Sequence, residues 1–121
     1  MSEIAYTETR YGPGHPLIAI VWASLGNGDT GKPFFPPRFT QRSVHIFGTF
    51  GSGGSITLQG SNERGTATSW ITLEDLWGDD LILTAAGLKQ IGSHGLQTRP
   101  NVTAGDGDTD LTIIMVGQIT K

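Results

Sequence analysis

The sequence contains no cysteine among its 121 residues. This absence excludes a disulfide framework, a thiolate metal site and a cysteine nucleophile. Charged residues are also scarce, at 16% of the chain, against about 25% in typical soluble domains. The net charge is −3 and lysine and arginine form no run. Because a nucleic-acid binder normally carries a basic patch, nucleic acid is not an expected partner.

Long apolar runs are missing as well. The longest extends from Leu17 to Ala23, far short of the roughly 20 residues that span a membrane. The first residues lack a basic start followed by an apolar stretch, so we expect neither a secretory signal nor a membrane partner. The chain has the length of one ordinary domain, which can bury a core without disulfides.

Glycine is frequent, with 18 residues, and it separates short segments rich in β-branched residues. The clearest segments are 17–24, 43–50, 55–61 and 111–120, and shorter ones lie at 69–73, 80–84 and 95–99, where Pro100 should end the strand. Residues 85–91 fit a helical turn or a short strand equally. Turn signals recur every 8–12 residues, a spacing typical of antiparallel sandwiches and barrels. We therefore predict an all-β, jelly-roll-like antiparallel β-sandwich.

The domain prediction separates the first sixteen residues from the rest. Pro13, Gly14 and Pro16 interrupt any regular element near the N-terminus. Residues 1–16 are therefore predicted to form an extended arm, with a frayed terminus as the alternative. Residues 17–121 are predicted to form a single β-sandwich domain.

A glycine-rich turn separates two strand-like segments in the middle of the chain. Residues 43–50 alternate, with Val44 and Ile46 facing one way and His45 and Phe47 the other. The sequence GSGG follows at 51–54, and a second strand-like run occupies 55–61. We predict a β-hairpin with a positive backbone φ in its turn. A phosphate-binding loop is disfavoured, because a strand rather than a helix follows the glycines.

The aromatic residues divide into two groups. Trp22, Trp70 and Phe50 lie in predicted strands and are expected to fill the core. The others lie in predicted loops or in the arm, near prolines, where aromatic side chains often anchor a partner. These candidate partner-binding residues are Tyr6, Tyr11, Phe34, Phe35 and Trp77. The alternative is that they cap the ends of their own sandwich.

Asp106, Asp108 and Asp110 alternate as the ligands of a calcium loop do. Such a loop also needs a glycine at its sixth position and a glutamate at its twelfth, where this chain has Leu111 and Gly117. We predict a structural, solvated turn, with a weak cation site at a subunit contact as the alternative.

No catalytic or metal-binding pattern is visible. His15, His45 and His94 lack the spacing of a metal motif, and no serine lies in a G-x-S-x-G elbow. The sequence therefore predicts no catalytic residue, no metal site and no cofactor, and we do not expect an enzyme.

From residue 43 onward the chain resembles small head proteins of tailed bacteriophages. The resemblance is carried by SVHIFGTFGSGGSITLQGSN at 43–62, WITLED at 70–75, LTAAGLKQI at 83–91 and RPNVTAGDGDTDLTIIMVGQ at 99–118. It implies a structural virion protein, a decoration (cement) protein that binds the outside of the major capsid protein shell and stabilises it. It further implies a homo-oligomer, made in the cytoplasm of a bacterial host and located on the capsid surface, without catalytic activity or cofactor. Residues 1–40 match no part of that family.

Two other functions fit the same residues. A carbohydrate-binding module could use an exposed Trp77 and loop acids to stack against a sugar and hydrogen-bond to it. A tail or head–tail structural protein would also be a small β domain of the virion.

Overall fold

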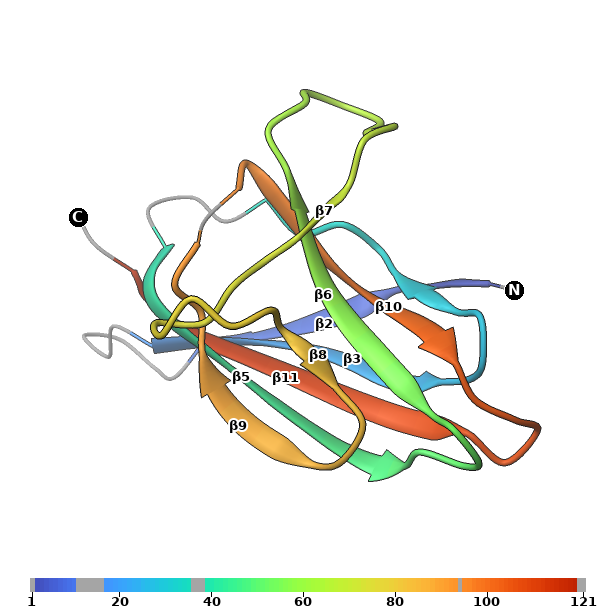
Figure 1. The fold of residues 1–121 in the computed structure, drawn as a ribbon. Coiled ribbons are helices and arrows are strands. Elements are labelled where there is room, and N and C mark those ends of the chain that lie inside the picture. Colours follow the sequence, from blue (N-terminus) through green and yellow to red (C-terminus); the bar gives the residue numbers. More distant parts are fainter. Residues whose placement is uncertain (1, 11–16, 36–38, 94, 120–121) are drawn as a thin grey trace.

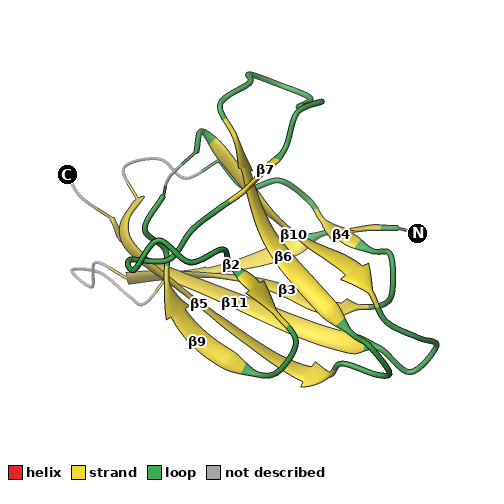
Figure 2. Cartoon of the chain, viewed as in Figure 1, coloured by secondary structure: helices red, strands yellow, loops and turns green. Residues whose placement is uncertain are grey.

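The computed structural model describes residues 2–10, 17–35, 39–93 and 95–119. Within these ranges the chain forms eleven strands and no helix (Figure 2). Accordingly, no described segment is a helix that could cross a membrane. The strands are β1 (Glu3–Ile4), β2 (Tyr6–Arg10), β3 (Leu17–Leu25), β4 (Thr30–Gly31), β5 (Phe39–Thr49), β6 (Ser55–Ser61), β7 (Ile71–Thr72), β8 (Ile82–Leu83), β9 (Gly87–Gln90), β10 (Gln97–Ala104) and β11 (Asp110–Ile119).

The strands form two sheets that face each other (Figure 1). The first sheet has the order β1-β4-β10-β6-β7, with β8 also paired to β6, and the second has the order β2-β3-β11-β5-β9. Every pair of strands is antiparallel except β1 with β4. The predicted all-β sandwich is therefore confirmed, and the segment 85–91 contains the short strand β9.

The core lies between the two sheets and follows the predicted alternation. On β5, Val44 and Ile46 are buried while His45 and Phe47 are exposed. Trp22 on β3 is completely buried, as predicted, and its indole Nε1 donates a hydrogen bond to the carbonyl of Lys32 at 3.0 Å. The buried apolar side chains are Ile18, Ile20, Trp22, Leu25, Phe34, Val44, Ile46, Ile56, Leu58, Leu73, Leu81, Leu83, Ile91, Val102, Leu111, Ile113 and Met115.

The predicted hairpin between residues 43 and 61 is wrong. β5 pairs with β11 and β9 in one sheet, whereas β6 pairs with β10, β7 and β8 in the other. The glycine segment 50–54 thus carries the chain from one sheet to the other (Figure 1). Each of the two strands buries one apolar face. Two strands that face each other across the core show this alternation, and so do two strands paired side by side in a hairpin.

Pro100 lies inside β10, so the prediction that it ends a strand is also wrong. On one side, β10 pairs with β6 over its full length, with Pro100 opposite Leu58. On the other side, Thr98 donates to the carbonyl of Phe34 and Val102 donates to that of Asp29. The N–H groups of residues 98 and 102 point away from β6, and in the alternating strand the nitrogen of Pro100 points the same way. It faces the short strand β4, where no continuous ladder of hydrogen bonds requires an N–H donor.

Residues 2–10 contain the two strands β1 and β2, and both belong to the sandwich. β1 pairs with β4 at one end of the first sheet, and β2 pairs with β3 at the edge of the second. Tyr6 is half-buried and packs against the core. Residues 11–16, with the prolines that suggested an arm, lie outside the described residues.

Candidate functional site

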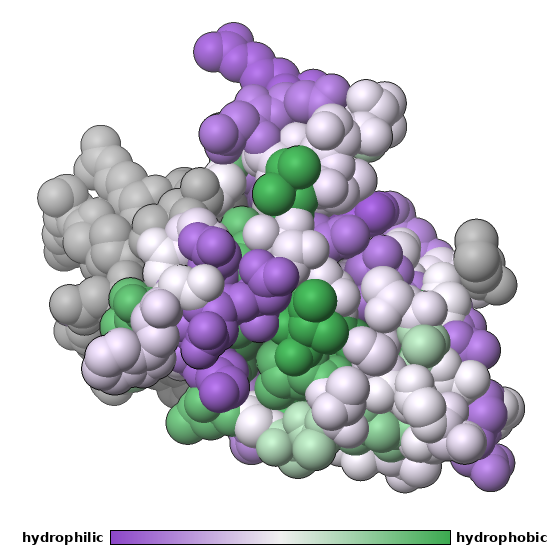
Figure 3. Space-filling view, in the orientation of Figure 1, coloured by the Kyte–Doolittle hydropathy of each residue, from purple (hydrophilic) through white to green (hydrophobic). Residues whose placement is uncertain are grey.

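Large apolar side chains are exposed at several places on the surface. In the face shown in Figure 3, apolar patches lie among hydrophilic side chains. The exposed residues are Phe35, Phe47, Ile71, Leu76, Trp77, Ile82, Leu88 and Leu96. Trp77 stands out, because 89% of its surface is accessible. Tryptophan is usually well buried, so such a side chain marks a candidate contact with another molecule.

The segment Glu74–Asp80, which we call the Trp77 turn, is organised by one carboxylate. The side chain of Asp75 is buried and accepts hydrogen bonds from the backbone N–H groups of Trp77, at 2.8 Å, and of Asp79, at 3.0 Å. The backbone N–H of Asp75 donates to the carbonyl of Asp79, and that of Gly78 donates to the carbonyl of Asp75. This side-chain-to-backbone pattern is a turn closed by aspartate. It fixes the backbone on both sides of Trp77.

The Trp77 turn is also attached to the strand end at residues 91–93. The backbone N–H groups of Gly92 and Ser93 donate to the carbonyl of Glu74, and the hydroxyl of Ser93 accepts from the backbone N–H of Glu74 at 2.8 Å. Gly92 has no Cβ where the backbone carbonyl of Asp75 approaches, so the close contact requires glycine here. The turn therefore presents Trp77 and its neighbour Leu76 from a fixed backbone, which reduces the entropy lost on binding a partner.

The five predicted partner-binding residues have different positions in the structure. Phe34 is only 4% exposed and belongs to the core, and Tyr6 packs its ring edge-on against Phe34 and Trp22. Phe34 thus fits the alternative that these aromatics fill their own sandwich, and for the half-buried Tyr6 contact with a partner stays a prediction. Phe35 is 45% exposed and Trp77 is 89% exposed. Tyr11 lies outside the described residues.

Trp70 is more exposed than predicted. It was expected in the core, but it is only half-buried, because β7 contains just two residues and Trp70 ends the preceding loop. Its ring lies 4.2 Å from the guanidinium carbon of Arg99. Phe50, the third predicted core aromatic, is partly buried and packs against the core.

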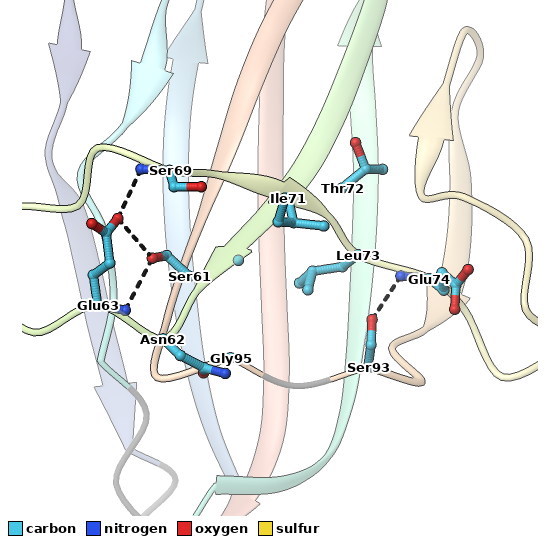
Figure 4. A pocket seen from close by; sticks show the side chains of 11 residues that line it. Ser61, Asn62, Glu63, Ser69, Ile71, Thr72, Leu73, Glu74, Ser93 and Gly95 are labelled. Carbon is cyan, nitrogen blue, oxygen red and sulfur yellow. Dashed lines mark hydrogen bonds between the residues drawn. The ribbon is translucent and has the colours of Figure 1, made fainter.

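A groove of about 770 Å³ runs beside β7 (Figure 4). On its rim, the carboxylate of Glu63 accepts hydrogen bonds from the backbone N–H groups of Ser69, at 2.7 Å, and Thr68, at 2.8 Å. These bonds hold the pKa of Glu63 below its usual value. The carboxylate of Glu63 therefore stabilises the conformation of the loop 62–70. Among the described residues, it contacts only two side-chain hydroxyls, those of Ser61 and Thr68.

The acidic turn near residue 106 has a structural role, as predicted. The carboxylate of Asp106 accepts hydrogen bonds from the backbone N–H groups of Ser52, at 2.8 Å, and Asp108, at 2.9 Å. Thr109 donates its hydroxyl to the carbonyl of Phe50 at 2.8 Å. These contacts join the two loops at one end of the sandwich. Among the described residues, no three histidine, aspartate or glutamate side chains lie close enough to hold a metal ion.

The bonds to Asp106 predict a dependence of stability on pH. The backbone N–H of Ser52, followed by that of Asp108, holds the pKa of Asp106 below its usual value in the folded state. The unfolded chain has a pKa of about 4 for this group. The stabilisation is therefore present above about pH 4 and is lost as the pH falls through the lower folded-state value. We expect Asp106→Asn to lower the melting temperature at pH 7 and to approach wild-type behaviour near pH 3.

Thermal unfolding of both proteins between pH 7 and pH 3 measures this effect. Asp108→Asn is the matched control, because Asp108 is exposed and its carboxylate makes no hydrogen bond among the described residues. Equal losses in the two variants, or a difference that persists at pH 3, would contradict the assignment.

The outer face of the second sheet offers a further apolar surface. The strand register places Leu88, His45, Ile114, Val21 and Thr7 in one row across all five strands. This row contains no aspartate, glutamate, lysine or arginine. Leu88 is 68% exposed, so the row is open to solvent at its β9 end.

The comparisons with known proteins give a likeness in fold. The structure is similar to that of the SPBc2 prophage-derived protein YomS, with a TM-score of 0.58 and 12% sequence identity over 84% of this chain and 93% of that one. A cupin domain from Bordetella pertussis Tohama I has a TM-score of 0.41 and 12% identity over 99% of both chains, too low a score to carry an argument. No family model and no curated protein sequence matches the chain. The first likeness shows that the sandwich also occurs in a prophage-derived protein.

Two features of the candidate sites were missed in the sequence. The aspartate-closed turn has a recognisable signal, because Asp75 precedes Trp77 by two residues and Gly78 follows it. The contact between Trp70 and Arg99 has no local signal, because the two residues come from distant segments.

Proposed function

We propose that this protein is a decoration (cement) protein of a tailed bacteriophage, which binds the outer surface of the major capsid protein shell and stabilises it. The Trp77 turn is the observation that carries the proposal. A tryptophan that is 89% exposed has little use to an isolated domain, and here its backbone is held by Asp75 on both sides. A rigid aromatic anchor of this kind is typical of the centre of a protein interface.

Two further observations support the same proposal. The sequence from residue 43 to residue 118 resembles phage head proteins, and the fold is shared with a prophage-derived protein. We accordingly propose that the protein is made in the bacterial cytoplasm, acts on the virion surface in several copies and has no catalytic activity.

Attachment to the shell should depend on Trp77. We expect Trp77→Ala to leave the domain folded, because the side chain makes few contacts with its own chain, and to weaken attachment more than tenfold, or about 1.4 kcal/mol or more. The measurement adds each purified protein to particles that lack it and determines occupancy against concentration. Leu76→Ala, on the same turn, should also weaken attachment.

Leu88→Ala is the matched control for Leu76→Ala, since it removes another exposed leucine, from β9. It should bind as the wild type does. Wild-type occupancy by Trp77→Ala would exclude the turn from the interface, and a loss confined to Leu88→Ala would move the interface to the outer face of the second sheet. Failure of the wild-type protein to bind particles would overturn the proposed function itself.

A further inference from the structure

A second hollow, of about 390 Å³, lies apart from the Trp77 turn. Its walls come from the N-terminal strand, the segment after β4, the loop 62–70 and β10. The side chains that bear on its chemistry are Glu3, Lys32, Phe35, Trp70, Gln97 and Arg99. We call this hollow the Arg99 pocket.

Arg99 is held in place from two sides. Its Nε donates a hydrogen bond to Oε1 of Gln59 at 3.0 Å, and the guanidinium carbon lies 4.2 Å from the centroid of the Trp70 ring. Both terminal amino groups of the guanidinium remain without a hydrogen-bond acceptor among the described residues. A guanidinium that is fixed through Nε and free at its two terminal nitrogens is prepared to bind an anion.

The loop 62–70, which carries Trp70, is also held in place by hydrogen bonds within the protein. Gln97 is 1% exposed, and its Nε2 donates to the carbonyls of Glu63 and Gly65, both at 2.9 Å. The carboxylate of Glu63 fixes the other end of the loop through the backbone of Thr68 and Ser69. These hydrogen bonds fix the conformation of the loop 62–70, so Trp70 occupies a defined position at the rim of the Arg99 pocket.

The remaining side chains define what kind of molecule fits. Phe35 is 45% exposed and adds a second aromatic ring to the pocket. Lys32 is exposed and its ammonium group has no ion-pair partner among the described residues. Glu3 adds one negative charge near Arg99. The pocket thus joins an aromatic surface to two cations and one carboxylate.

We propose that the Arg99 pocket binds a carboxylate-bearing sugar, of the uronic acid class. The guanidinium and Lys32 would receive the sugar carboxylate, and the ring of Phe35 would pack against the C–H face of the sugar. A neutral sugar would leave the two cations unpaired. Glu3 reduces the net charge of the two cations to +1, which matches the single negative charge of a carboxylate. The proposal does not depend on attachment to a shell.

Calorimetric titration of the purified full-length protein tests the assignment. The probe is a galacturonate trimer, and the comparison ligands are the neutral galactose trimer, galactose 6-phosphate and sodium acetate. We expect saturable binding of the galacturonate trimer, at least tenfold tighter than that of each comparison ligand. Arg99→Gln should weaken galacturonate binding at least tenfold.

Lys32→Gln keeps the test valid if Arg99→Gln fails to fold, because Lys32 is exposed. It should weaken galacturonate binding several-fold without a change in melting temperature, whereas Lys89→Gln, an exposed lysine on β9, should bind as the wild type does. The absence of saturable galacturonate binding overturns the proposal. So does equal affinity for acetate or the neutral trimer, or tighter binding of a glutamate-rich peptide.

Discussion

Replacing Phe34 with alanine should lower the free energy of unfolding by about 3–5 kcal/mol, the usual effect of removing a buried phenylalanine side chain. The ring is 4% exposed and lies in the core, where Tyr6 meets it edge-on at a centroid distance of 5.5 Å. The backbone of Phe34 also exchanges two hydrogen bonds with Thr98, both of 2.9 Å. The neighbouring strands are thus held in position and can close only part of the cavity that the truncation leaves.

Phe35→Ala is the matched control for this prediction. Its side chain is 45% exposed, so the same chemical change should alter the free energy of unfolding by less than about 1 kcal/mol. Urea unfolding of the two variants and the wild type measures the difference, provided that the slope with urea stays constant. Similar losses in both variants would mean that Phe34 is not the buried member of the pair.

The difference in burial between these two phenylalanines could not be predicted from the sequence. Phe34 and Phe35 are adjacent, identical and flanked by prolines, so no local signal separates them. In an extended chain, neighbouring side chains point to opposite faces, and one of the two must therefore face inward. The pairing of Phe34 with Thr98, 64 residues later, decides which one does.

The same limit applies to the strands. The alternation in residues 43–50 predicts correctly that Val44 and Ile46 are buried. It contains no information about which strand lies beside β5, because two strands that face each other across a core show the same pattern as two strands of a hairpin. The neighbour is set by the long ladders of β5 with β11 and of β6 with β10.

The candidate sites differ in how far they could be predicted. Trp77 lies in a local turn whose aspartate and glycine are visible in the sequence, and its exposure follows from that turn. The Arg99 pocket brings together residues near positions 3, 35, 70 and 99. A site of this kind can be recognised only after the strand order is known.

The glycines between β5 and β6 give the second large expected effect. The sequence predicts a positive φ at Gly53, at Gly54 or at both. The structure separates the two positions. Gly53 has a φ of 68°, and a Cβ there would meet no atom within 4 Å. Gly54 has no positive φ, but it is buried, and the backbone carbonyl of Phe50 occupies the place of its Cβ.

Gly54→Ala should therefore lower the free energy of unfolding by about 3 kcal/mol, at the upper end of the range for overpacking, because a backbone carbonyl cannot rotate away as a side chain can. Gly53→Val should lower it by about 1–2 kcal/mol through backbone strain alone. Gly53→Asn, which tolerates the left-handed conformation, should lie close to the wild type. Urea unfolding of the three variants gives this order. If Gly54→Ala proves as stable as Gly53→Asn, the contact with Phe50 is wrong, and with it the path by which the chain crosses from one sheet to the other.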